Sequence, residues 1–264
     1  MSKGIQRLTR FFAIVVLSLC IVSPALAAKP LVVGMELAYP PFEMTDTSGK
    51  PDGVSVQLAM ELGKSLGRPV EIRNMAFDGL IPALKTGKID IIISSMTATA
   101  ERARSIDFSD PYLTTGLCLL VGKSVTVTTI AELDRPGRTI AVKKGTTGHN
   151  YAASHIKQAS VLVLDKEAAA VLEVVQGKAD AFIYDQMSTY QNYQRNKETT
   201  RAILKPFQTE SWAIGIRKGN SDLKGKINRF LADFRRNGGF DRLGDRYLRE
   251  EKEAFRRLGF PFFL

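Results

Sequence analysis

The chain has 264 residues and a formal net charge of +10 at pH 7, from 37 basic against 27 acidic residues. The basic residues are scattered among acidic ones, with no basic arm and no interleaved aromatic platform, so we expect no nucleic-acid partner. The only histidines, His149 and His155, are too few and wrongly spaced for a zinc site, and we expect no metal and no cofactor.

The first 27 residues have the pattern of a secretory signal peptide. A positive start precedes an apolar run at residues 11–22, and Ala25-Leu26-Ala27 supplies a small-x-small cleavage site. The run is short for a membrane span and no stop-transfer pattern follows it. We therefore expect residues 1–27 to be cleaved and the mature protein to be periplasmic. The mature chain keeps one cysteine, Cys118, within an apolar run, where we expect a buried small hydrophobe.

The mature chain opens with alternating strands and helices. Apolar runs predict strands, and apolar positions at helical spacing predict the helices between them. This alternation is typical of a parallel sheet with crossover helices. We expect strands at 31–34, 70–72 and 91–93, helices at 54–66 and 80–84, a loop at 39–43 and a turn at 51–53.

The stretch after the third strand suggests an anion site. The strand stops at Ser94, and Thr99 is a plausible N-cap for a helix over residues 100–103. Arg102 then lies in the first turn, where the helix dipole disfavours a cation. A bound anion would reverse this cost, because helix-end amides and a guanidinium can hold one carboxylate together. The alternative is an ordinary surface arginine beside Glu101.

A second unit repeats the first. Residues 83–93 resemble residues 174–183: each has a helix end, a Gly-Lys turn, an aspartate and a buried strand. Two similar α/β units argue for two lobes, and ligands of open α/β sheets bind at the carboxyl ends of the strands. Two such ends facing each other would form a cleft. In this part we expect strands at 139–142, 161–164, 181–183, 201–204 and 212–216, and helices at 168–175, 186–193 and from 223 onward.

The motifs together resemble the polar amino-acid-binding proteins of bacterial ABC importers, the extracellular solute-binding proteins of family 3. The matching segments are 39–43 (YPPFE), 77–84 (FDGLIPAL), 87–90 (GKID), 94–99 (SSMTAT), 101–102 (ER) and 106–112 (IDFSDPY). The resemblance implies a type II, two-lobed α/β periplasmic binding fold. Lobe one would be 28–112 plus 212–264, lobe two 117–207, and the hinge 113–116 and 208–211.

The resemblance also implies a set of ligand-binding residues. The positions for the ligand α-carboxylate are matched by Arg102, Ser95 and Thr97, with Thr146 and Thr147 closing from lobe two. The position for the α-ammonium is matched by Asp185, helped by the carbonyl of Ser94 or Ser95. The aromatic pair around the ligand side chain is matched by Tyr39 and Phe77.

Two further residues bear on the ligand side chain. Glu36 matches a position where relatives often carry aspartate, and beside Tyr39 and Phe77 it favours a basic amino acid through charge pairing and cation–π contact. Lys143 lines the same expected cleft and instead favours a neutral or acidic ligand. A solvated carboxylate at a strand end is the alternative for Glu36.

The resemblance implies a monomeric receptor that binds a polar, basic L-amino acid and serves an inner-membrane ABC permease. A dehydratase of cyclohexadienyl acids is known on this fold, but the position that would supply its acid holds Ser188 here, so we expect no enzyme. A binding module that serves a sensor receptor would have the same pocket and stays open as an alternative.

Overall fold

The computed structural model describes residues 28–260. The predicted signal peptide lies outside these residues. One eight-stranded mixed sheet runs through the molecule in the order β4-β1-β5-β10-β6-β9-β7-β8, and β2 and β3 form a small hairpin. The strands are β1 Leu31–Met35, β2 Met44–Thr45, β3 Pro51–Asp52, β4 Val70–Asn74, β5 Ile91–Ile92, β6 Ile106–Gly122, β7 Thr139–Lys143, β8 Ser160–Leu164, β9 Ala181–Asp185 and β10 Thr200–Arg217.

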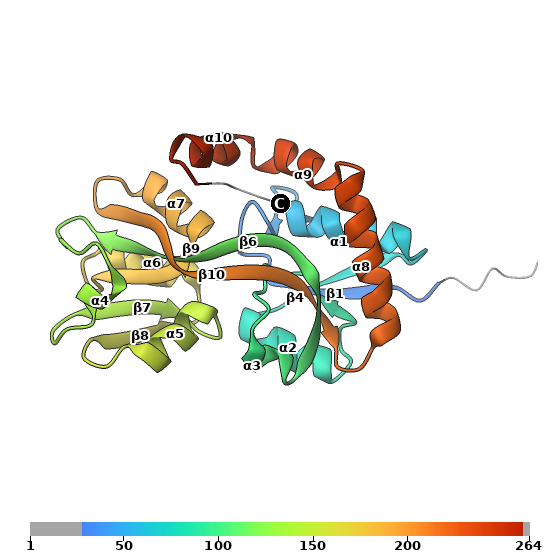
Figure 1. The fold of residues 1–264 in the computed structure, drawn as a ribbon, viewed down its shortest axis with the longest axis horizontal. Coiled ribbons are helices and arrows are strands. Elements are labelled where there is room, and N and C mark those ends of the chain that lie inside the picture. Colours follow the sequence, from blue (N-terminus) through green and yellow to red (C-terminus); the bar gives the residue numbers. More distant parts are fainter. Residues whose placement is uncertain (1–27, 261–264) are drawn as a thin grey trace, which may run out of the picture.

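The sheet has two parallel units joined by two long strands. β1 pairs in parallel with β4 and β5, and β7 pairs in parallel with β8 and β9. β6 and β10 run antiparallel to each other and pass from one unit to the other. Figure 1 shows the result as two lobes, with β6 and β10 crossing between them. The predicted two-lobed α/β fold is confirmed.

The strand prediction divided β10 into two strands and did not include the full length of β6. Residues 201–204 and 212–216 are not separate strands but parts of β10, which continues through the polar stretch between them. Its pairing with β6 is irregular between Ile203 and Gln208, a span that contains Pro206, which has no backbone N–H to donate. The expected hinge segments 113–116 and 208–211 pair with each other. The exact lobe boundaries stay a prediction.

Helices cover the sheet in both lobes. Their bounds are α1 Val54–Ser65, η1 Phe77–Gly79, α2 Leu80–Lys85, α3 Ala100–Ala103, α4 Ile130–Leu133, α5 Thr147–His155, α6 Glu167–Val175, α7 Gln186–Arg195, α8 Ser221–Arg236, α9 Gly239–Tyr247 and α10 Arg249–Arg257. The buried positions of α1 recur at the predicted helical spacing. Within the predicted turn at 51–53, Pro51 and Asp52 instead form the strand β3, because they pair with β2.

Gly53 is required where β3 turns into α1. Its φ is +118°, and a Cβ added there would lie 2.4 Å from the carbonyl oxygen of Phe42. Only glycine adopts this backbone conformation readily and leaves room for the neighbouring loop. The glycine therefore ties α1 to the loop at 39–43.

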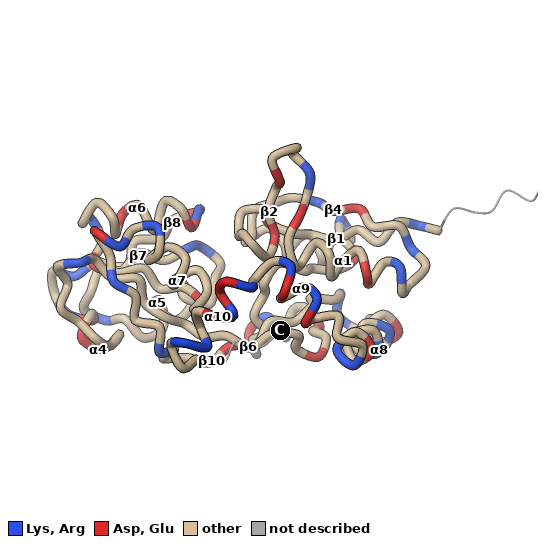
Figure 2. Tube along the Cα trace, turned by 90° about the horizontal axis from the view of Figure 1, so that it is seen from above, with Lys and Arg blue, Asp and Glu red and all other residues tan. Residues whose placement is uncertain are grey.

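Each lobe has its own apolar core. The core of lobe one includes Leu31, Leu58 and Ile91, and the core of lobe two includes Leu119 and Ile140. Cys118 is 0% exposed, as predicted for a buried small hydrophobe. Among the residues described, none belongs to a helix long and apolar enough to cross a membrane. Figure 2 shows basic and acidic residues interspersed along both lobes.

The last helix extends from lobe one toward lobe two. Figure 1 shows α9 and α10 running over the top of the molecule toward α7. The Gln191 side-chain amide donates to the Glu251 carboxylate at 3.0 Å, and the Tyr190 and Phe255 rings lie 5.2 Å apart. Helix α10 therefore contacts both lobes.

Candidate functional site

One cavity lies between the lobes, and the predicted site residues surround it. It leaves about 40 Å³ for the centres of water molecules, which is room for a few waters. Every predicted residue except Lys143 lines it, and Lys143 reaches it by pairing with Glu36. The predicted lining residues are Glu36, Tyr39, Phe77, Ser94, Ser95, Thr97, Arg102, Thr146, Thr147 and Asp185.

Arg102 is the cation on the lobe-one side. The Thr99 hydroxyl accepts from the backbone N–H of Arg102 at 3.2 Å, so the predicted N-cap of α3 is confirmed. The guanidinium donates to the carbonyl of Thr97 at 2.7 Å and, across the cleft, to the carbonyl of Gly145 at 3.0 Å. Burial lowers its pKa, although a guanidinium stays charged at neutral pH. Arg102 is thus a buried charge, which a bound anion would stabilise.

The start of α5 faces the same cavity from lobe two. Thr146 is its N-cap: the hydroxyl accepts from the backbone N–H of His149 at 3.3 Å and donates to the carbonyl of Lys143 at 2.7 Å. Thr147 and Gly148, the first residues of the helix, also line the cavity. A helix N-terminus favours negative charge. The guanidinium of Arg102 and this helix end therefore bring positive potential into one space from both lobes.

Asp185 is the carboxylate on the lobe-two side. It ends β9 and caps α7, accepting from the backbone N–H groups of Met187 and Ser188 at 3.0 and 3.1 Å. The Tyr39 hydroxyl of lobe one donates to it at 2.6 Å. Burial, the largest influence, raises the pKa of Asp185 to about 7. An ammonium group placed beside Asp185 would favour its ionised form.

Glu43 is a buried carboxyl that the sequence reasoning did not assign to the site. It is 1% exposed, and burial raises its pKa to about 8. The hydroxyls of Ser55 and Ser95 donate to it at 2.6 and 3.1 Å, and that of Ser94 lies 3.4 Å away. Glu43 therefore holds the two serines that follow β5. Its place in the Tyr-Pro-Pro-Phe-Glu motif was the signal that could have revealed it.

The chain between β5 and α3 is held in an unusual conformation. Ser95 has φ +49°, the only positive φ among the non-glycine residues described. Thr97 forms a bridge with Trp212, and its hydroxyl donates to Glu210 at 3.0 Å. Trp212 and Glu210 both belong to β10 and both line the cavity. From the sequence we placed Glu210 in the hinge segment 208–211 and Trp212 in a strand at 212–216, and assigned neither residue to the site.

Aromatic rings form one wall of the cavity. Tyr39 stacks on Phe42 with ring centroids 5.4 Å apart and meets Tyr184 and Trp212 edge-on at 6.2 and 6.0 Å. The Phe77 ring lies against a positive group: the centre of the Arg102 guanidinium is 5.4 Å from the Phe77 ring centroid. This wall provides apolar surface between the charged groups.

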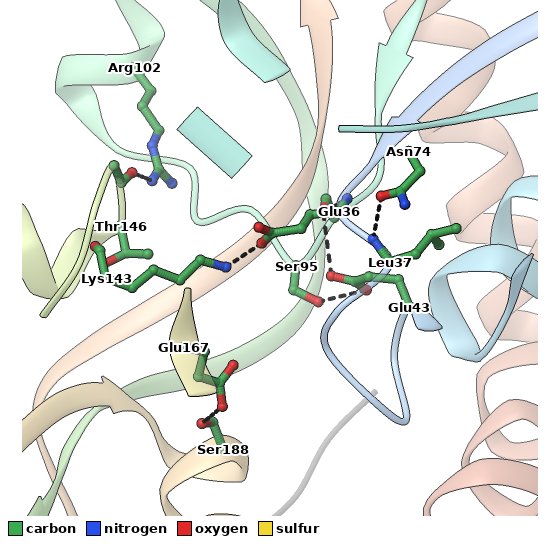
Figure 3. A network of polar contacts seen from close by, with 12 residues as sticks. Glu36, Leu37, Glu43, Asn74, Ser95, Arg102, Lys143, Thr146, Glu167 and Ser188 are labelled. Atoms are coloured by element: carbon green, nitrogen blue, oxygen red, sulfur yellow. Dashed lines mark hydrogen bonds and ion pairs between the residues drawn. The ribbon is translucent and has the colours of Figure 1, made fainter. Parts of the chain in front are cut away.

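Lys143 crosses from lobe two to the lobe-one side of the cavity. Its side chain is 4% exposed and its ammonium forms an ion pair with the Glu36 carboxylate. Figure 3 shows the extended lysine reaching Glu36, with Ser95 and Glu43 next to Glu36 and Glu167 below the pair. The same ammonium lies 5.5 Å from the Phe77 ring centroid. Glu36 and Lys143, for which we expected opposite ligand preferences, are therefore paired with each other.

Further contacts join the lobes at the mouth of the cavity. Lys144 pairs with Asp78 at 3.1 Å, and the Asn150 side-chain amide donates to Glu101 at 2.8 Å. Within residues 28–260 there is no group of three or more His, Cys, Asp or Glu side chains arranged to hold a metal ion. The site thus offers positive and negative groups, and both hydrogen-bond donors and acceptors, within a closed interface between the lobes.

Comparison with known proteins identifies the family. Residues 31–250 match the model of the bacterial extracellular solute-binding proteins, family 3. The chain belongs to this family. It consists of ligand-binding proteins of transporters, which act in the periplasm or outside the cell.

Individual relatives cover most of the chain. The L-arginine-binding protein of Pseudomonas aeruginosa is 33% identical over 234 residues, 85% of this chain and 90% of that protein. A binding component of an ABC transporter from Wolinella succinogenes, solved with lysine, is 37% identical with a TM-score of 0.78, covering 83% of this chain and 95% of that one.

A third match has a link to enzymes. The structure of an ancestral amino-acid-binding protein, described as a precursor of cyclohexadienyl dehydratase, is 35% identical with a TM-score of 0.76, covering 83% of this chain and 95% of that one. Other relatives are named as binding proteins for cystine, glutamine and histidine. Relatives of this chain therefore include proteins for several polar amino acids.

Proposed function

We propose that this protein captures a polar L-amino acid between its lobes in the periplasm and delivers it to an inner-membrane ABC permease. The observation that carries the proposal is that two groups of opposite charge line one cavity, Arg102 from lobe one and Asp185 from lobe two. An amino-acid zwitterion needs a cation and an anion held apart in a site shielded from water.

In this proposal the ligand α-carboxylate binds Arg102, Ser95 and Thr97 on lobe one. The start of α5, at Thr146 and Thr147, meets the same carboxylate from lobe two. The ligand α-ammonium binds Asp185 and a backbone carbonyl at Ser94 or Ser95. The side chain lies between Tyr39 and Phe77, toward Glu36 and Lys143.

Lobe closure provides the signal for transport. Arg102, Tyr39, Glu36 and Asp78 all contact lobe two, and the cavity between the lobes is small, so a ligand must enter when the lobes are apart. Bending at 113–116 and 208–211 would separate 28–112 plus 212–264 from 117–207. A ligand that contacts both lobes stabilises the closed state. The permease would recognise the closed state. The protein would act as a monomer, released by cleavage after Ala27.

We propose no catalytic activity. A dehydration needs a placed acid, and Ser188 stands where the enzyme on this fold would supply one. The nearest carboxyl is Glu167, which accepts from the Ser188 hydroxyl at 2.5 Å and from the Asn192 amide at 2.9 Å. Incubation with prephenate and arogenate tests this part of the proposal: consumption of either compound contradicts it.

The experiment for the binding proposal is a thermal shift measured on protein refolded from denaturant, which removes ligand carried over from the cell. A ligand at 100 times its Kd adds about 2.7 kcal/mol to the free energy of unfolding. We expect a rise in Tm with at least one polar amino acid and none with its D-enantiomer. A Tm unchanged by all twenty amino acids contradicts the proposal.

A further inference from the structure

Lys143 occupies the position that a cationic ligand side chain would need. A basic amino acid in this cavity would place its charge against a carboxylate and an aromatic face. The candidates for those two partners are Glu36 and Phe77. Lys143 is ion-paired to the first and lies 5.5 Å from the centroid of the second. The protein therefore already contains a cation in the subsite where arginine or lysine would place theirs.

This internal cation is firmly built into lobe two. Lys143 is the last residue of β7, whose backbone pairs with β8 at Leu164. Its carbonyl accepts from the Thr146 hydroxyl that caps α5, so the backbone at Lys143 is part of the same turn as the predicted carboxylate site. The residue is 3% exposed. A buried ammonium is stable only with a counter-charge, and Glu36 supplies it.

The remaining hydrogen-bonding capacity of the pair has a definite chemistry. A lysine ammonium only donates hydrogen bonds, and an ionised carboxylate only accepts them. A ligand group that meets both must accept from one and donate to the other. A carboxamide has an oxygen acceptor and an NH₂ donor on the same carbon. A cationic side chain would be repelled by Lys143, and an anionic one by Glu36.

We propose that Lys143 and Glu36 together select a side-chain carboxamide, so that the ligand is a neutral amide amino acid such as glutamine or asparagine and basic amino acids are excluded. This inference rests on the proposed function and specifies the ligand class of the same site. Lys143 is then the residue that determines specificity, because it neutralises the carboxylate that would otherwise attract a cation.

One other carboxyl could take Lys143 away from Glu36. Glu167, at the start of α6, is near enough for Lys143 to lower its pKa, although burial raises that pKa overall. Its Oε1 is bound by Ser188 and Asn192, and its buried Oε2 has no hydrogen-bond partner. If Lys143 moved to Glu167 on ligand binding, Glu36 would be free for a basic ligand. The ranking of ligands separates these two arrangements.

The test is calorimetric titration of refolded protein with glutamine, asparagine, glutamate, arginine and lysine. We expect glutamine or asparagine to bind at least tenfold more tightly than arginine or lysine. Lys143→Met should shift the ratio of amide to basic amino-acid affinities at least tenfold toward the basic amino acids. Glu36→Gln should shift the relative affinities toward glutamate. Lys178→Met is the matched control, because Lys178 is an exposed lysine of lobe two that is not among the residues lining the cavity; its ranking should equal that of the unmodified protein.

The outcomes are distinct for the two proposals. If the unmodified protein binds arginine or lysine most tightly, or if Lys143→Met leaves the ratio unchanged in a protein with normal circular dichroism, the carboxamide inference is wrong and the receptor function stands. If none of these five amino acids binds, the carboxamide inference is wrong, and the receptor function is also wrong only if the thermal shift shows no response to any of the twenty. The ranking for the unmodified protein decides the inference even if a variant fails to fold.

Discussion

Replacing Arg102 should strongly weaken ligand binding, and the structure sets the size of the effect. A guanidinium that holds a carboxylate with two charge-assisted hydrogen bonds gains about 1.5–3 kcal/mol from each. In the structure the same guanidinium donates to the carbonyls of Thr97 and Gly145 at 2.7 and 3.0 Å. Two of its five N–H donors are therefore already in use, and for the binding lost with Arg102 we expect the lower end, about 3 kcal/mol or roughly 150-fold in Kd.

Calorimetric titration of Arg102→Ala and Arg102→Lys measures this loss. Lysine keeps the positive charge but cannot form the two parallel hydrogen bonds of a guanidinium to a carboxylate, so it should recover less than half of the lost binding free energy. Arg104→Ala is the control: Arg104 is the exposed residue that follows α3, and its removal should change Kd by less than about twofold. A Kd for Arg102→Ala within fivefold of the unmodified protein, in a variant that melts normally, would refute the carboxylate site.

Three further predictions follow from buried groups and backbone geometry. Since burial raises the pKa of Asp185 to about 7, and an ammonium binds its ionised form, affinity should fall about tenfold per pH unit below pH 7; titrations from pH 5 to 8 should show this slope, and Asp185→Asn should lose it. Glu43 has a pKa of about 8 in the folded protein and an ordinary value of 4.5, so it favours the folded state at low pH and loses that stabilisation as pH rises from about 4.5 to about 8. The free energy of unfolding in urea should therefore fall less over this window for Glu43→Gln than for the unmodified protein. An equal pH slope in both proteins would contradict the raised pKa of Glu43. Gly53→Ala should destabilise the protein by about 2 kcal/mol or more beyond Gly49→Ala, since both glycines have positive φ but only the Gly53 Cβ would meet the backbone; equal urea midpoints for the two variants would count against this account.

Local patterns predicted most of the strands and helices, and the family resemblance predicted the type of fold and much of the cavity lining. The Thr99 cap of α3, the strand before Ser94 and the position of Asp185 at the end of β9 depend on residues close in sequence, and all appear where expected. The continuity of β10 did not follow from pattern, because the polar segment around Pro206 has no strand periodicity and is extended only through its pairing with β6.

Contacts between the lobes were beyond reach of the sequence. Glu36 and Lys143 are 107 residues apart, and their pairing depends on the relative position of two separately folded lobes. The two residues were read as alternatives with opposite ligand preferences. The structure shows that they act on each other, which changes the electrostatic character of the subsite.

The receptor function is tested most directly by the melting temperature of refolded mature protein with each of the twenty amino acids, prephenate and arogenate. We predict that at least one polar L-amino acid raises Tm, and that Arg102→Ala removes the rise. A protein whose Tm responds to prephenate or arogenate alone, or to none of these compounds, would contradict the assignment as an amino-acid receptor.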